Sequence, residues 1–255
     1  MVWVAQITDV HLDGSDGARE RFERVADWMG ALRPGLAAIL LTGDLVEEGA
    51  GTQEDYRLIR DRLAPIAPLI AVPGNADDLD AFDTIFGWDR NPSQASTPGT
   101  WLVPVADRVW IAPLDSSDCE ENGWSLDQEP VAEVTSEIAA LPPDARVLVA
   151  LHHPPTTIGH AIMDQMCLRE VGALEDLVRN DPRVIGVVAG HIHAGLMTSF
   201  AGKPLVVGPA VQSGLRLDAE LSGAQPELLL GDVPPMLAVH RILDGRLISW
   251  FRVIV

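Results

Sequence analysis

Residues of the types that can bind metal ions follow several short apolar runs in this sequence. The first pair is Asp9 and His11, which come directly after an apolar, β-branched run that begins at Val2. Residues two apart on a strand point to the same side, so this carboxylate and this imidazole face one ligand. The pair suits a divalent metal ion, yet one pair at a strand end is a weak signal, because most exposed Asp and His residues bind no metal.

Four more apolar runs end in side chains of the same kind. They deliver Gly43-Asp44 after residues 36–41, Gly74-Asn75 after 69–72, His152-His153 after 146–151, and Gly190-His191-Ile192-His193 after 184–189. A Gly-Asp or Gly-Asn step alone is usually an ordinary turn, and a single histidine is usually a solvated loop residue. That explanation is adequate for one of these residues and poor for all of them together.

The chemistry of this set points to two metal ions. The candidate ligands are Asp9, His11, Asp44, Asn75, His152, His191 and His193. They exceed the needs of one tetrahedral zinc ion and suit two divalent ions about 3.5–4 Å apart that share a carboxylate bridge. Mixed imidazole and carboxylate donors favour manganese, iron (Fe²⁺ or Fe³⁺) or zinc over an all-oxygen magnesium site. With two aspartates as its only anions, such a site attracts phosphate, which favours phosphoester hydrolysis by an activated water.

The elements that must position these side chains follow from the hydrophobic pattern. Helical spacing of apolar residues predicts helices over 18–32, 52–63, 126–141 and 169–179. Strands alternate with helices in the first third, which predicts a largely parallel sheet with the functional loops at its carboxyl ends. An irregular connection is expected over 90–100, an antiparallel pair over 101–114, and a final hairpin over 236–255 around Asp244-Gly245.

Composition limits the class of protein. At 255 residues, with 47% hydrophobic and 22% charged residues, the chain is expected to form a single domain over 1–255 with an irregular insertion around 215–235. The net charge of −19 argues against nucleic-acid polymers and anionic membranes as partners. Cys119 and Cys167 form no disulfide framework. No signal peptide and no long apolar run stand out, so a cytoplasmic location is expected.

The ordered series D-x-H, G-D, G-N-x-D, H and G-x-H resembles the calcineurin-like metallophosphoesterases, over Val4 to about Gln212. The run His152-His153-Pro154-Pro155, followed by Gly159 and Met163-Asp164, is similar to class III cyclic nucleotide phosphodiesterases and related bacterial glycerophosphodiesterases. The resemblance implies an α/β fold of two facing mixed β-sheets flanked by helices, and a homodimer.

Roles for the ligands also come from the resemblance. It implies that Asp9, His11, Asp44 and His193 hold one metal ion, that Asp44, Asn75, His152 and His191 hold the other, and that Asp44 bridges them. A metal-activated hydroxide would attack phosphorus in line with the leaving alkoxide.

The sequence departs from the family pattern at Ala76, where the family has the histidine of G-N-H-D. The usual acid is therefore missing, and general acid catalysis is worth about 10²–10⁴-fold. His153 or a metal-bound water is the expected substitute. Asp44, Asn75 and His153 are the expected catalytic residues, with Asn75, His153 and Asp164 contacting the substrate.

The sequence thus predicts a metal-dependent phosphodiesterase for a small diester, with 3′,5′-cyclic AMP as the first choice. Glycerophosphodiesters, 2′,3′-cyclic nucleotides or a broad range of diesters are alternatives on the same scaffold. A non-catalytic binding scaffold is the alternative from another class, and only Ala76 favours it. The acidic pairs Glu47-Glu48 and Asp77-Asp78 are expected to be solvated loop charge.

Overall fold

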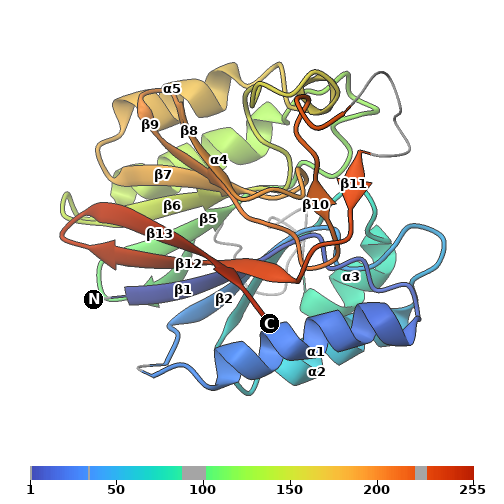
Figure 1. The fold of residues 1–255 in the computed structure, drawn as a ribbon. Helices are drawn as coiled ribbons and strands as arrows, with labels where there is room; N and C mark the ends of the chain where they lie inside the picture. Colours follow the sequence, from blue (N-terminus) through green and yellow to red (C-terminus); the bar gives the residue numbers. More distant parts are fainter. Residues whose placement is uncertain (1, 34, 88–101, 222–228) are drawn as a thin grey trace.

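Two β-sheets pack face to face, with helices on both outer sides (Figure 1). The computed structural model describes residues 2–33, 35–87, 102–221 and 229–255. The α/β architecture with two mixed sheets, predicted from the resemblance, is confirmed.

The first sheet has the strand order β13-β12-β1-β2-β3. Its strands are β1 (Val2–Ile7), β2 (Ala38–Thr42), β3 (Leu69–Val72), β12 (Met236–Leu243) and β13 (Arg246–Val253). The first three are parallel, as the alternation of strand and helix predicted, and β12 and β13 form an antiparallel hairpin beside β1. Its outer face carries α1 (Asp16–Gly30), α2 (Gln53–Leu63) and α3 (Leu79–Phe86).

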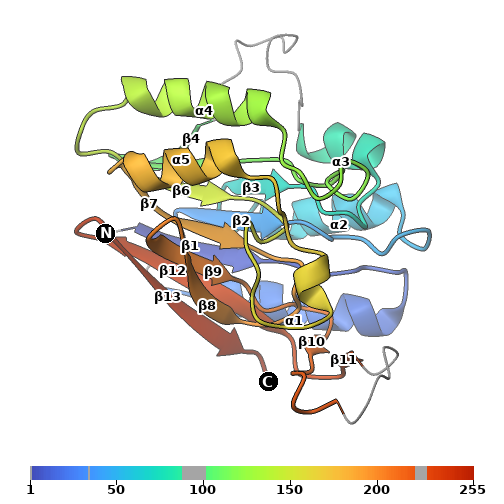
Figure 2. The same ribbon diagram turned by 90° about the horizontal axis from the view of Figure 1, so that it is seen from above.

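The second sheet has the order β4-β5-β6-β7-β9-β8. Its strands are β4 (Val103–Ala106), β5 (Val109–Pro113), β6 (Arg146–Ala150), β7 (Val184–Ala189), β8 (Leu196–Phe200) and β9 (Lys203–Val207). Figure 2 shows α4 (Gln128–Ala140) and α5 (Gly172–Asn180) lying over it. Strands β5, β6, β7 and β9 are parallel, so the carboxyl ends of β6 and β7 lie at one edge.

Burial explains these elements. In α1, the Ser15 side chain accepts a hydrogen bond from the backbone N–H of Ala18, and the apolar stripe from Phe22 to Met29 faces the sheet. Strands β2 and β7 are buried at every position, the pattern of a strand covered on both faces. Between the sheets lies an apolar layer that includes Val4, Leu40, Leu148 and Val188.

Some elements differ from the expectations. Helix α3 and the short strands β10 (Gly214–Leu215) and β11 (Leu230–Gly231), which pair with each other, were not anticipated. The expected irregular connection over 90–100 lies outside the described residues, as does the middle of the expected insertion around 215–235. Within the described part of the chain, no helix has the length and apolar surface that crossing a bilayer requires.

A buried histidine on β12 gives the fold a pH dependence. Burial lowers the pKa of His240 to about 4, whereas a histidine in the unfolded chain titrates near 6.5. The unfolded chain therefore binds the additional proton between these values, and stability present above about pH 6.5 is lost as the pH falls toward 4. We expect the unfolding free energy to fall by about 2 kcal/mol between about pH 8 and pH 5 because of this residue. Urea unfolding of the wild type and of His240→Gln at both pH values tests this, and equal pH dependence in the two proteins would contradict it.

Candidate metal centre

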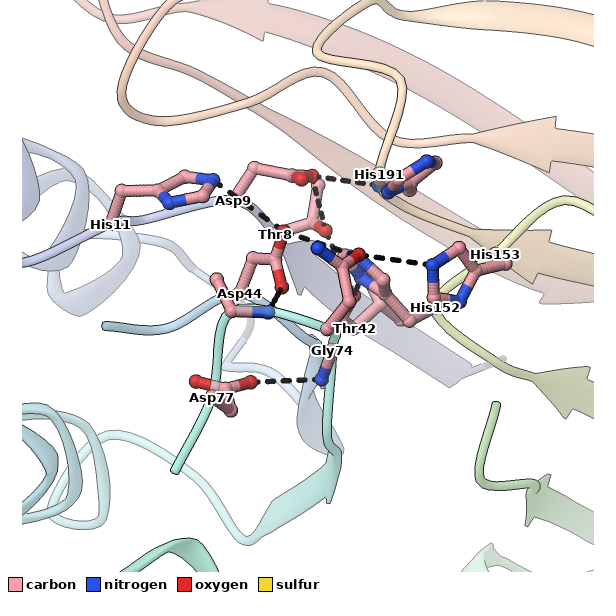
Figure 3. Close-up of polar contacts among 12 residues, drawn as sticks. Thr8, Asp9, His11, Thr42, Asp44, Gly74, Asp77, His152, His153 and His191 are labelled. Carbon is pink, nitrogen blue, oxygen red and sulfur yellow. Dashed lines mark hydrogen bonds and ion pairs between the residues drawn. The ribbon is translucent and has the colours of Figure 1, made fainter. Parts of the chain in front are cut away.

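Five strand ends bring the predicted ligands to one edge of the molecule, between the two sheets. The ends of β1, β2 and β3 deliver Asp9, His11, Asp44 and Asn75 from the first sheet, and the ends of β6 and β7 deliver His152, His191 and His193 from the second. Figure 3 shows several of these side chains converging from both sheets. The site is therefore built by both halves of the fold.

The backbone at this edge is unusual. Asp9, His11, Asp44, His191 and His193 all have positive φ, at 51°, 46°, 52°, 69° and 55°. L-residues rarely adopt this left-handed conformation, and such strain concentrates at functional sites. Here it turns the chain sharply after each strand, so that the side chains point into the space between the sheets.

Close backbone approach explains a glycine of the motifs. A Cβ atom on Gly74 would lie 2.2 Å from Oδ1 of Asp44 and 2.4 Å from its backbone nitrogen. The absence of a side chain at Gly74 therefore lets the β3 turn pack directly against Asp44. The backbone N–H of Ala76, on the same turn, donates a 2.8 Å hydrogen bond to Oδ1 of Asp44.

One group of ligands gathers around the end of β1. Nε2 of His193 lies 3.4 Å from Oδ1 of Asp9 and 3.2 Å from Nε2 of His11. Oδ2 of Asp44 lies 3.6 Å from Nε2 of His11. These four side chains are those predicted to share one metal ion, and their donor atoms face one another.

A second group gathers around the end of β6. Oδ2 of Asp44 lies 3.3 Å from Nε2 of His152. Donor atoms of His152, His153 and His191 all lie within 4.8 Å of one another. The same oxygen of Asp44 therefore faces both groups, which is the placement a bridging carboxylate needs.

Polar contacts of the opposite ring nitrogens orient three of the histidines. Nδ1 of His152 donates to the carbonyl oxygen of Thr42 at 2.6 Å, and Nδ1 of His193 lies 2.7 Å from the hydroxyl of Ser213. Oε2 of Glu47 lies 2.8 Å from Nδ1 of His11. In each case Nε2 is left to face the site, the arrangement usual for metal-binding imidazoles.

Four buried polar atoms of the cluster make no hydrogen bond with the described residues: Oδ1 of Asp9, Nδ1 of His11, Nε2 of His152 and Nε2 of His191. Buried polar atoms are nearly always satisfied, because leaving one unpaired costs about 1–3 kcal/mol. All four belong to predicted ligands, and Nδ1 of His11 faces the carboxylate of Glu47. The donor set therefore fits a pair of metal ions, which would satisfy the other three atoms.

The pKa values of the histidines also suit ligation. Burial lowers the pKa of His191 to about 3 and that of His193 to about 4, so both rings are neutral at pH 7, the form that binds metals. Burial also lowers the pKa of His152, but the carboxylates of Asp44 and Asp9 outweigh it and raise the value to about 9. Ligation by His152 would thus release a proton.

Asp77 differs from the expectation of solvated loop charge. It is buried, and its carboxylate accepts hydrogen bonds from the backbone N–H groups of Leu45, Val46 and Gly74 and from the hydroxyl of Tyr56. Burial and the Asp44 carboxylate raise the pKa of Asp77 to about 7. Asp77 therefore ties together the loops that carry Asp44 and Asn75.

The predicted catalytic residue His153 holds Asn75. Its Nε2 lies 3.0 Å from Oδ1 of Asn75, and its Nδ1 lies 3.1 Å from the hydroxyl of Ser116. Asp164 accepts hydrogen bonds from the backbone N–H groups of Ile158 and Gly159, so it shapes the loop after β6. Its expected contact with substrate stays a prediction.

Several supporting residues escaped the sequence-based prediction. Ser116, Ser213 and the carbonyl of Thr42 have no distinctive sequence pattern, and Glu47 was expected to be surface charge alone. Its carboxylate is exposed, as expected, but it also faces the ring of His11. Asp77 carried a signal, its place in G-N-x-D.

Comparison with known proteins gives a consistent picture. The family model described as calcineurin-like phosphoesterase matches residues 2–195. A 3′,5′-cyclic-nucleotide phosphodiesterase from Nostoc sp. is 32% identical over 199 residues, which cover 74% of this chain and 71% of that protein. A glycerophosphodiester phosphodiesterase from Enterobacter lignolyticus is 28% identical over 229 residues, covering 89% of this chain and 79% of that protein.

Among solved structures, a dimetal phosphatase from Danio rerio has a similar fold. The TM-score is 0.63 at 14% sequence identity, and the match covers 100% of this chain and 96% of the other. At this identity the likeness concerns the fold alone.

Proposed function

Because the chain belongs to the calcineurin-like phosphoesterase family, we propose that it hydrolyses 3′,5′-cyclic nucleotides, with cyclic AMP as the first choice. The family predicted from the motifs is confirmed, and the chain is a metal-dependent phosphodiester hydrolase. The cyclic substrate is supported by the relatives that are cyclic-nucleotide phosphodiesterases.

The observation that carries this proposal is the position of Asp44. One oxygen, Oδ2, lies 3.6 Å from Nε2 of His11 and 3.3 Å from Nε2 of His152, so it faces ligands from both sheets and from both groups. A single carboxylate oxygen placed between two groups of donor atoms fits the bridging position of a dinuclear centre.

We propose that the two ions are manganese, iron or zinc, because each group contains two imidazole nitrogens beside its oxygen donors. Asp9, His11, Asp44 and His193 would hold one ion, and Asp44, Asn75, His152 and His191 the other. When bound, a pair of divalent ions lowers the pKa of water and offsets the charge that develops on the phosphoryl oxygens.

The protein's own residues then bind and orient the diester. Asn75 is exposed whereas the other candidate ligands are buried or nearly so, so the substrate would approach from the Asn75 side. His153 contacts Oδ1 of Asn75 and thereby fixes the orientation of the Asn75 side chain on the side from which the substrate would approach. Ala76 beside it provides no acid, so the leaving alkoxide would take its proton from solvent or from His153, although burial holds the pKa of His153 well below its usual range.

Trp124 supports a substrate with a nucleobase. Its indole lies edge to face with the ring of His153, with centroids 5.9 Å apart, and it is partly exposed. The residue has a φ of 66°, and its backbone is held by hydrogen bonds to Cys119 and from Arg169. A bulky residue in this left-handed conformation is costly, and such backbone strain concentrates at functional sites.

We expect Trp124→Ala to weaken inhibition by AMP about tenfold while inhibition by ribose 5-phosphate changes little. These two ligands differ in the base alone, and stacking on an aromatic side chain is worth about 1–3 kcal/mol per base. Steady-state inhibition assays measure both constants, with Trp124→Phe expected to restore AMP binding and Trp250→Ala on β13 as the matched control. An equal loss for both ligands would show that Trp124 has no role in base binding.

A glycerophosphodiester is the second candidate substrate, because the relative from Enterobacter lignolyticus carries that activity in its name and aligns over most of this chain. Such a substrate has no base to stack on Trp124. The two candidates therefore predict different results in the inhibition assay. A cyclic-nucleotide substrate predicts weaker inhibition by AMP alone in Trp124→Ala, and a glycerophosphodiester substrate predicts no difference between AMP and ribose 5-phosphate.

Product analysis by phosphorus NMR tests the proposed function directly. The protein, analysed for metal content and supplied with Mn²⁺, would be given 3′,5′-cyclic AMP, 2′,3′-cyclic AMP, glycerophosphocholine and an activated bis-aryl phosphate. We expect turnover of 3′,5′-cyclic AMP that Asn75→Ala abolishes. Turnover of glycerophosphocholine alone would replace the proposed substrate, and absence of bound metal together with absence of turnover would overturn the enzyme assignment.

A further inference from the structure

A fully buried amide connects the two sheets directly beneath the candidate metal centre. Gln6 lies next to the end of β1, and its Nε2 donates hydrogen bonds to the hydroxyl of Thr42 at 2.9 Å and to the carbonyl of Ala189 at 2.7 Å. Thr42 ends β2 in the first sheet, and Ala189 ends β7 in the second. One side chain therefore joins strands from both sheets.

The residues that Gln6 holds lead directly into the predicted ligands. Thr42 is followed by Gly43-Asp44, and Ala189 is followed by Gly190-His191. The carbonyl of Thr42 also accepts the Nδ1–H of His152. Any shift of these strand ends relative to one another therefore moves ligands of both metal groups.

The orientation of the amide is fixed from its other end. Since Nε2 of Gln6 faces a carbonyl, Oε1 must be the atom that accepts from Nε2 of His240, at 3.0 Å. Nδ1 of His240 in turn lies 2.8 Å from the hydroxyl of Ser249. Both Gln6 and His240 are fully buried, so solvent cannot substitute for these partners.

Gly208, which follows β9 of the second sheet, leaves room for this amide. A Cβ atom on Gly208 would lie 2.9 Å from both Cδ and Nε2 of Gln6, closer than packed atoms tolerate. The backbone N–H of Gly208 also donates to the carbonyl of Ala189 at 2.8 Å, so the glycine and the amide share one acceptor. The space around Gln6 is thus fitted to an amide that spans the sheets.

We propose that Gln6 is a positioning residue for the dinuclear site. It sets the spacing between the ligands carried by the first sheet and those carried by the second. It acts through its hydrogen bonds to the side-chain hydroxyl of Thr42 and the backbone carbonyl of Ala189, and no hydrogen bond joins it to a candidate ligand among the described residues. The inference rests on the proposed metal centre. Loss of such a supporting contact in metalloproteins typically weakens metal binding by about 10–100-fold.

The test is a Mn²⁺ titration of Gln6→Met followed by electron paramagnetic resonance. Methionine keeps the length of the side chain and removes all three hydrogen bonds of the amide, with Thr42, Ala189 and His240. In the wild type we expect two ions with a spin-coupled spectrum, because magnetic coupling depends on the distance between them. In Gln6→Met we expect the affinity for the second ion to fall about 10–100-fold and the coupled signal to weaken. Gln128→Met, at an exposed position, is the matched control.

Urea unfolding of the metal-free proteins separates positioning from stability. If the role of Gln6 is purely structural, Gln6→Met lowers the unfolding free energy and leaves metal affinity and coupling unchanged in the folded protein. That result would overturn the inference.

A second test uses Gly208→Ala, whose added Cβ would displace the amide. We expect Gly208→Ala alone to lower the affinity for the second ion. The same change should have a smaller effect when it is added to Gln6→Ala, because the two changes act on one contact. A wild type that binds no pair of ions would instead refute the metal centre itself.

Discussion

Asp44→Asn is expected to lower kcat/KM by about 10³-fold or more and to reduce bound metal from two ions to one or none. A loss of this size corresponds to about 4 kcal/mol of transition-state stabilisation. Asparagine keeps the shape and still accepts the hydrogen bond from the backbone N–H of Ala76. It removes the negative charge that faces both His11 and His152. Metal analysis and steady-state kinetics measure the two effects.

The matched control is Asp78→Asn, which changes an exposed carboxylate in the neighbouring turn. Asp78 caps α3 by accepting from the backbone N–H of Ala81, a role asparagine performs equally well. We expect wild-type activity and metal content from this variant. Full metal content in Asp44→Asn would show that Asp44 does not bridge the ions.

Gly190→Ala is expected to destabilise the protein by about 1–3 kcal/mol or more and to reduce activity by about 10²-fold. A Cβ atom at this position would lie 1.9 Å from the hydroxyl of Thr8 and 2.8 Å from the carbonyl of Thr42. Overpacking a close contact costs stability, and small displacements of a reactive site cost rate. The hydroxyl of Thr8 donates to Oδ2 of Asp9 at 2.6 Å, so the clash acts directly on a predicted ligand. Thermal unfolding and kinetics measure both changes.

A double variant separates the two effects. Adding Thr8→Ala to Gly190→Ala removes the hydroxyl in conflict, so stability should recover in part. Activity should stay low, because Asp9 keeps the hydrogen bond from the backbone N–H of His191 but has lost the one from Thr8. Gly17→Ala is the control, since a Cβ there meets nothing within 4 Å. Unchanged stability in Gly190→Ala would contradict the packing described here.

The sequence predicted the ligand-bearing strands well because their signal is local. A fully buried parallel strand reads as a short apolar run, and its carboxyl end is marked by the polar residues that follow. The bounds of β3 and β7 agree with the expected ranges for this reason. Parallel strands bring such ends together, so convergence of Asp9, Asp44 and His191 follows from topology.

The supporting residues were harder to predict because their partners are distant in the chain. Gln6 contacts Ala189 across 183 positions and His240 across 234. Nothing about a glutamine near the end of a strand indicates that it faces the other sheet. Asp77 was misjudged for a related reason: a carboxylate in a turn is usually solvated, and its burial depends on donors from the β2 loop and α2.

The positive φ angles of five candidate ligands bear on how the site should be mutated. Alanine in that conformation costs about 1 kcal/mol, whereas asparagine and glycine adopt it more readily. In an alanine variant of Asp9, His11 or His193, the effect of losing a metal ligand would therefore be combined with the effect of a rearranged local backbone. Inactive variants intended to trap a bound substrate are better built with asparagine, so that the turn keeps its shape while the ligand atom changes.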